Sequence, residues 1–220
     1  CMGVGGKRKA RAAVWVFTAL AVCSRFLLGV SVGDRDAEHA DLFVGQIALV
    51  FKTLPLFVVD NWKAYYGAFL RIAYRVVRRR RRSRSQRGQR PGPVLAPRGD
   101  LHVAVVNKIR DAKGKLLKVA RFALYGTLKA AKKIVLEGGV GRMINTSFLE
   151  RLHAAMRGQT ARLFRRTRAG SRLVGMLQSQ LWLWRDVYNW LRRHRSLQGR
   201  TPAMAQGLTD HVWSMQEYVR

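Results

Sequence analysis

Two carboxylates stand out in a chain that has few acidic residues. Asp60 ends a short apolar stretch that is typical of a β-strand, and open α/β sheets place ligand sites at the carboxyl ends of their strands. Glu150 lies in the first turn of a predicted helix, close in sequence to Arg151 and Arg157. Two carboxylates brought together in such basic surroundings could hold divalent metal over a phosphodiester, while the cations bind the phosphate backbone.

Each carboxylate also has a purely structural interpretation. Asp60 could cap the helix that is predicted to begin at Asn61. Residues 147–150 (SFLE) form a capping-box pattern, in which the Glu150 carboxylate returns a hydrogen bond to the Ser147 amide. Ninety residues separate Asp60 from Glu150, so no local motif links them. The spacing alone leaves both interpretations open.

Four segments, in the right order along the chain, resemble one protein family. Residues 145–153 (NTSFLERLH) resemble an N-T-S-x-x-E-R-x-N block, and residues 60–65 (DNWKAY) resemble a D-G-W-x-A-Y block. Residues 32–36 (VGDRD) are similar to V-G-x-R-x, and residues 188–204 are similar to a Y-N-x-x-R-P-H-x-S-L tail. The family is that of small bacterial insertion-element transposases, the DDE enzymes of the insertion-sequence-one type.

The resemblance implies an α/β fold of the RNase H type, with a mixed sheet flanked by helices. In that family three carboxylates bind two Mg²⁺ (or Mn²⁺) ions per intact site, and the matching positions make Asp60 the second carboxylate and Glu150 the third. The implied chemistry is cleavage that frees a 3′-hydroxyl, which then attacks target DNA. The implied partners are transposon-end DNA, target DNA and further copies of the chain in a synaptic complex. The implied location is the nucleoid in the cytoplasm.

The first carboxylate of the family has no match here. The segment Val4–Lys7 resembles the turn that follows it, which places that aspartate at or before Cys1, and no acidic residue precedes Asp34. We therefore expect a truncated or decayed transposase that binds DNA without an intact metal triad. His153 replaces the usual Asn; it either orients phosphate or the metal shell, or is an ordinary surface histidine. Other departures are Asn61 for Gly and Arg193 for the tail Pro.

The charge of the chain favours a polyanionic partner. Lys and Arg number 42 against 12 Asp and Glu, which gives a net charge of +30, so a nucleic acid or an anionic membrane is expected. A noncatalytic DNA- or RNA-binding protein is the main alternative to the transposase, and a merely solvated basic surface is the alternative for the Arg runs. The residues expected to contact DNA are Trp62, Lys63, Tyr65, Asn145, Arg151, His153, Arg157, Arg162, Arg165, Arg166, Arg192 and His194.

Three regions are expected to carry these residues. Residues 1–77 form the first part of the catalytic core, residues 78–140 a basic linker and β-hairpin insertion, and residues 141–220 a helical second part with Glu150. Strands are predicted at 13–22, 26–32, 54–60, 101–109 and 116–124, and helices at 37–50, 61–77, 127–136, 146–156 and 171–193. Residues 78–90 read as a flexible linker rich in Arg.

The first residues were also considered as a targeting segment. Residues 7–11 are basic and residues 12–23 are apolar, which mimics a secretory or lipoprotein signal. The apolar run stops at Ser24 and Arg25, too short to span a bilayer, and resumes as a second strand. No other segment could cross a membrane, and two cysteines cannot form a disulfide framework. A cytoplasmic protein without membrane attachment is expected.

Overall fold

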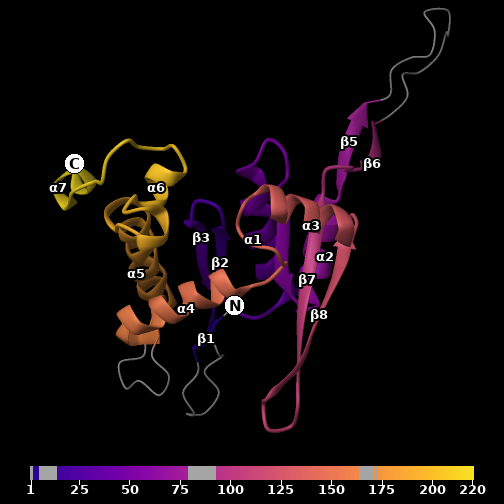
Figure 1. Ribbon diagram of the computed structural model, residues 1–220, viewed down its shortest axis with the longest axis horizontal. Coiled ribbons are helices and arrows are strands. Elements are labelled where there is room, and N and C mark those ends of the chain that lie inside the picture. The colour runs from indigo at the N-terminus through magenta and orange to yellow at the C-terminus, as the bar shows by residue number, and fades with distance from the viewer. Residues whose placement is uncertain (1, 5–13, 79–92, 164–170, 172) are drawn as a thin grey trace, which may run out of the picture. The chain divides into compact units, whose positions relative to one another are not determined.

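The computed structural model describes residues 2–4, 14–78, 93–163, 171 and 173–220. The chain divides into two compact units, each with its own β-sheet (Figure 1). Unit 1 contains Cys1–His39 and Lys132–Arg220, and unit 2 contains Ala40–Ala131. The protein is therefore of mixed α/β class, as expected from the alternation of apolar strands and amphipathic helices.

The sheet of unit 1 is a three-stranded antiparallel meander in the order β1-β2-β3. Its strands are β1 (Met2–Val4), β2 (Val14–Ala21) and β3 (Phe26–Gly33). The connection from β2 to β3 places Arg25 in the left-handed region with φ of 59°, and the Ser24 hydroxyl accepts a hydrogen bond from the amide of Phe26. The predicted hairpin is confirmed.

A long helical segment protects the free edge of β3. It comprises α5 (Val174–Asp186) and a π-helical turn over Val187–Leu191. The Gln178 side chain accepts from the amide of Val32 at 2.6 Å and donates to the carbonyl of Val30 at 3.0 Å. The Asn189 side chain accepts from the amide of Leu27 at 2.9 Å and donates to the carbonyl of Leu27 at 3.0 Å. Two side-chain amides thus take the place of a further strand and satisfy an edge that would otherwise pair with another chain.

The core of unit 1 forms between the meander and two helical segments. Helix α4 (Ser147–Gln159), followed by a 3-10 turn at Ala161–Leu163, contributes one side and α5 the other. Deeply buried side chains from all of these elements meet there: Val16, Leu27, Val30, Val32, Leu152, Met156, Leu163, Leu177, Leu181 and Tyr188. Leu173 and Val174 are exposed, because α5 begins at Val174 and its first turn lies outside the core.

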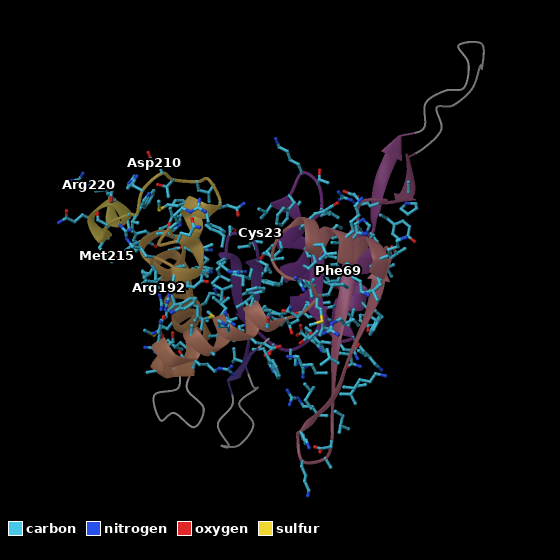
Figure 2. All side chains as sticks on the ribbon, viewed as in Figure 1. Cys23, Phe69, Arg192, Asp210, Met215 and Arg220 are labelled. Carbon is cyan, nitrogen blue, oxygen red and sulfur yellow. The ribbon has the colours of Figure 1, made fainter. Side chains whose placement is uncertain are left out.

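The last residues fold back onto the π-helical turn. A 3-10 turn at Arg195–Leu197 precedes α6 (Pro202–Ala205) and α7 (Met215–Val219). The Trp213 ring packs 4.6 Å from that of Trp190, and the Tyr218 hydroxyl donates to Asp186 at 2.9 Å. Figure 2 labels Asp210, Met215 and Arg220 along this C-terminal segment.

The sheet of unit 2 is mixed. Strand β4 (Leu56–Asp60) pairs in parallel with β7 (His102–Arg110), which pairs antiparallel with β8 (Leu116–Tyr125). Val103–Val106 are buried without interruption, as is usual for a central strand covered on both faces. Helix α2 (Ala64–Ile72) packs on this sheet through Phe69, whose ring lies 5.1 Å from that of Phe57; Figure 2 labels Phe69.

The helix expected over residues 61–77 is wrong at both ends. Helix α2 begins at Ala64 and ends at Ile72, after which Tyr74–Arg78 forms strand β5. This strand pairs antiparallel with β6 (Pro93–Pro97), and the amide of Arg98 donates to the Ala73 carbonyl at 2.7 Å. The β-branched pair Val76 and Val77 favours the strand once a partner strand is present. Beyond Arg78, the Arg-rich linker predicted over 78–90 lies outside the described residues.

The two remaining helices have the caps that the sequence predicts. Helix α1 (Ala37–Leu49) begins after Asp36, whose carboxylate accepts from the amide of His39 at 2.8 Å. Helix α3 (Leu128–Glu137) begins after Thr127, whose hydroxyl accepts from the amide of Ala130 at 3.1 Å, and ends before Gly139 with φ of 63°. Among the described residues, no helix has both the length and the apolar character needed to cross a bilayer.

Candidate catalytic carboxylates and nucleic-acid interface

Asp60 lies where the sequence predicts, at the carboxyl end of β4. Its side chain is exposed, and no described residue hydrogen-bonds to it or forms an ion pair with it. The capping alternative is contradicted, because the residue before α2 is Lys63 and the helix receives no side-chain cap. Asp60 therefore has no structural role among the described residues, which leaves its carboxylate available to a ligand.

Glu150 has a local partner. The Thr146 hydroxyl donates to its carboxylate at 2.6 Å, and its amide donates to the Thr146 carbonyl at 3.0 Å. The predicted capping box is wrong in detail, because Ser147 is the first residue of α4 and its amide donates to the Asn145 side chain instead. Glu150 is exposed in the first turn, where the helix dipole favours a negative charge.

Most other acidic side chains in this cationic protein have a hydrogen-bond or ion-pair partner among the described residues. Arg71 pairs with Asp41 at 2.8 Å and Arg98 with Asp100 at 3.2 Å. The remaining engaged carboxylates are Asp36, Asp111, Glu137, Asp186, Asp210 and Glu217. Asp34, Glu38 and Asp60 are the carboxylates without a described partner. Of these three, Asp60 alone ends a strand that pairs in parallel, which is where α/β sheets bind ligands.

His153 is a buried residue, not the ordinary surface histidine that the sequence analysis left open. It is 6% exposed, and its Nε2 lies 2.6 Å from the Thr18 hydroxyl of β2, across the interior of unit 1. The pKa of His153 is lowered to about 3, chiefly by burial and also by Arg157, while Glu150 acts in the opposite direction. The imidazole is therefore neutral at physiological pH and holds α4 against the sheet, with little surface for a phosphate.

The residues expected to contact DNA after Asp60 differ in exposure. Lys63 is exposed and Trp62 is half-buried. Tyr65 is 8% exposed, with its ring 5.1 Å from Trp62 and 6.4 Å from Phe69. The Tyr65 ring thus packs on protein, so it offers no open face for a splayed base. Lys63 remains beside Asp60 as an accessible cation.

The predicted contact residues around Glu150 form a second group. Arg151 is exposed, Arg157 is half-buried, and Asn145 is occupied at the start of α4, where it bonds to Met143 and Ser147. Arg162 is half-buried and donates to the Ser171 hydroxyl at 3.4 Å. Arg165 and Arg166 lie outside the described residues.

Arg192 and His194 follow the π-helical turn. Arg192 is exposed, and Figure 2 labels it. The His194 ring meets that of Tyr188 edge-on at 4.6 Å, and burial lowers the pKa of His194. Its Nε2 is buried and has no hydrogen-bond partner among the described residues. The side chains of Arg192 and His194 therefore lie in different environments, and only Arg192 is openly accessible to a polyanion.

The predicted metal ligands belong to different units, Asp60 to unit 2 and Glu150 to unit 1. Their carboxylate oxygens are the hard donors that Mg²⁺ prefers. However, the described part of the chain contains no group of three or more His, Cys, Asp or Glu side chains that could hold a metal ion. The donor chemistry suits the ion but the described set does not complete a site, so no reaction step through a metal is derived.

The sequence analysis did not single out the cations of β7 and β8. Lys108, Arg110, Lys118 and Arg121 lie on these strands, and Lys113 and Lys115 in the turn between them. The signal that could have identified them is alternation, since Lys108 and Arg110 are two residues apart in a strand and so share a face.

A scan against protein-family models, a search of curated proteins and a search of solved structures each found no match for this chain.

Proposed function

We propose that this chain is a DNA-binding protein of the DDE transposase kind, in which Asp60 and Glu150 are two of the carboxylates used in DNA strand cleavage and transfer. The observation that carries the proposal is Asp60, an exposed carboxylate without a described partner at the end of a parallel strand. What distinguishes Asp60 from the other unpartnered carboxylates, Asp34 and Glu38, is its place at the carboxyl end of a strand that pairs in parallel, where α/β sheets bind ligands.

The finer architectural proposal is an RNase H-like fold. It is supported only by the order of elements along the chain: an antiparallel three-stranded meander, a helix, and a strand that ends in Asp60. The parallel partner of that strand is β7, and the two belong to a separate sheet from the meander. The proposed partners are element-end and target DNA, with several copies of the chain in one synaptic complex at the nucleoid. Bound Mg²⁺ or Mn²⁺ would supply charge neutralisation at the phosphodiester.

Mn²⁺ binding tests the carboxylate assignment without relying on turnover. Electron paramagnetic resonance would follow free Mn²⁺ during titration of the protein in the presence of duplex DNA. We expect Asp60→Asn and Glu150→Gln each to weaken Mn²⁺ binding at least tenfold. Asp34→Asn is the matched control, because Asp34 is also exposed and without a described partner. Equal Mn²⁺ binding by wild type and all three variants would refute the proposal for the two carboxylates.

A noncatalytic nucleic-acid-binding protein is the second candidate. It is favoured by the hydrogen bond from the Thr146 hydroxyl to the Glu150 carboxylate, which gives Glu150 a local role at the start of α4. For this candidate, Glu150→Gln should leave Mn²⁺ binding unchanged, whereas Glu150→Met, which removes the acceptor of the Thr146 hydroxyl, should lower the free energy of unfolding by about 1 kcal/mol. Thr146→Val should then produce the same loss of stability, since it removes the same bond.

A further inference from the structure

The hairpin formed by β7 and β8 extends beyond the third strand of its sheet. Strand β4 pairs with β7 only from His102 to Val106, whereas β7 and β8 remain paired as far as Arg110 and Leu116. Residues 107–120 are therefore a two-stranded ribbon, and the strand portion on each side is about 14 Å long. Figure 1 shows these strands continuing as a twisted pair to the turn that joins them.

The ribbon has a regular arrangement of cations. Residues directly opposite each other in an antiparallel ladder point to the same face. Lys108 pairs with Val119 and Arg121 with Val106, so Lys108, Arg110 and Arg121 share one face at intervals of about 7 Å along the strands. Lys118 points to the other face, opposite Ile109. Exposed Lys113 and Lys115 extend the positive charge around the turn.

The turn is built to hold this shape. The Asp111 amide donates to the Lys115 carbonyl, and the Asp111 carbonyl accepts from the Gly114 amide, both at 3.0 Å. The Asp111 carboxylate accepts from the Lys115 amide at 2.8 Å. Gly114 has φ of 83°, the left-handed conformation that a three-residue hairpin loop requires. Arg110 donates to the Gly114 carbonyl at 2.9 Å. The one acidic residue of the ribbon is thus part of the turn, and the lysine side chains project from a fixed frame.

An exposed apolar side chain, that of Leu117, lies in sequence between the cations Lys115 and Lys118. The register shifts between Ile109 and Arg110, so Leu117 is the extra residue of a β-bulge, and its side chain is 63% exposed. Bulges re-aim side chains and often lie beside functional sites. In the major groove, an apolar side chain can contact the methyl group of thymine while neighbouring cations bind the phosphates.

We propose that the β7–β8 ribbon, residues 107–120, together with the adjoining Arg121, is an arm that enters a groove of double-stranded DNA. A two-stranded ribbon fits the major groove, which is about 12 Å wide, and cations on the ribbon reach the phosphates. The inference deepens the proposed function by naming the surface that binds the duplex. Duplex DNA accounts for the observations better than an anionic membrane, because the cations are spaced regularly along both strands and one face carries three of them.

Charge-matched variants test the arm. The ribbon variant Lys113→Gln, Lys115→Gln, Lys118→Gln removes three exposed cations. The control Lys52→Gln, Lys129→Gln, Lys132→Gln removes three exposed cations from other elements and leaves the same net charge. Binding to a fluorescent 20-base-pair duplex is followed by anisotropy against salt. The ribbon variant should flatten the log–log salt slope by about 3 and weaken binding at 0.1 M salt on the order of a hundredfold, with a much smaller change in the control.

Each outcome bears on a different statement. A flat salt slope for the wild type would refute DNA binding and with it the proposed function. Steep wild-type binding with equal losses in both triple variants would overturn the arm alone. Loss of binding to phosphatidylserine vesicles in the ribbon variant, with DNA binding intact, would also overturn it and assign the ribbon to membranes. Circular dichroism checks that both variants fold.

A cross-linking measurement covers the case in which the ribbon variant is misfolded. A photo-reactive benzoylphenylalanine at Leu117 should form a covalent adduct with the duplex. The same residue at Leu49, which is 87% exposed on α1 in unit 2, serves as the control and should not. Equal adduct yield at both positions, or none at Leu117, contradicts the arm.

Discussion

The buried imidazole of His153 makes a quantitative prediction about stability and pH. Its pKa is about 3 in the folded protein, because burial disfavours the charged ring, and about 6.5 in an unfolded chain. Between these two values the unfolded state binds more protons than the folded state. The free energy of unfolding must therefore rise with pH over this range and be lost as the pH falls below 6.5.

The size of the effect at pH 5 depends little on the folded pKa. Each pH unit below 6.5 costs about 1.4 kcal/mol while the folded imidazole stays neutral, so lowering the pH from 7.5 to 5 costs about 2 kcal/mol through this residue. A folded pKa of 4 instead of 3 leaves that figure almost unchanged. The prediction thus depends on the burial of His153 in the folded protein, where the residue is 6% exposed.

Urea unfolding at a series of pH values measures the effect. The variant His153→Gln keeps a neutral hydrogen-bonding side chain and removes the titration, so its stability should fall by about 2 kcal/mol less than that of the wild type between pH 7.5 and 5. The control Thr18→Val removes the partner and keeps the buried ring, so it should retain the wild-type pH dependence. Identical pH profiles for wild type and His153→Gln would refute the reasoning, as would an NMR titration that gives His153 an ordinary pKa.

Two further predictions concern the elements that hold the sites. Asn189→Leu should lower the free energy of unfolding by about 3 kcal/mol, since it leaves two backbone groups of Leu27 buried and unpaired. Gln178→Leu, at a more exposed position on the same edge, should lower it by about 1 kcal/mol. Urea unfolding measures both losses, and equal losses would contradict the role of burial. Gly114→Ala should cost about 1 kcal/mol from its positive φ alone, while Gly99→Ala, with open space and no positive φ, should be nearly neutral.

Elements whose pairing is local could be predicted from the sequence. The β2–β3 hairpin and the β7–β8 hairpin each consist of β-branched or apolar runs that flank a short turn, and their strands pair with the next strand along the chain. Asp36 identified the start of α1 in the same way. In each case the residues that decide the structure are neighbours in the sequence.

Strand β5 shows what local patterns miss. Residues 74–77 continue a helical pattern, and the sequence predicts a helix there, but the structure has strand β5, whose partner β6 begins at Pro93. The choice between helix and strand there depends on a pairing between segments that are separated by 14 residues, 79–92. The partner strand β6 has proline at both ends, and proline is not typical of strands, so the sequence of β6 did not indicate a strand. Propensity yields to tertiary pairing at such positions.

The candidate site residues show the same difference between local and long-range determinants. The position of Asp60 followed from strand polarity, which is a local property, and the structure confirms that it ends β4. The environment of His153 did not, because its partner Thr18 lies 135 residues earlier in the chain. Three-residue spacing from Glu150 suggested a shared functional face, yet helix α4 turns His153 inward with Leu152 and Met156. Spacing along a helix identifies neighbours on its surface without showing which stripe is buried.

Asp60 and Asp111 have different surroundings, and the difference bears on the proposed ligand site. Both follow a strand in unit 2. Asp111 is tied into its turn by the Lys115 amide, and Asp60 bonds to no described residue. In a chain with so large an excess of cations, a carboxylate could readily gain a local partner, and most do. The proposed ligand site at Asp60 rests on its position at the end of β4 together with this absence of a described partner, whereas the proposed DNA-binding role of the ribbon beyond Val106 does not depend on Asp60.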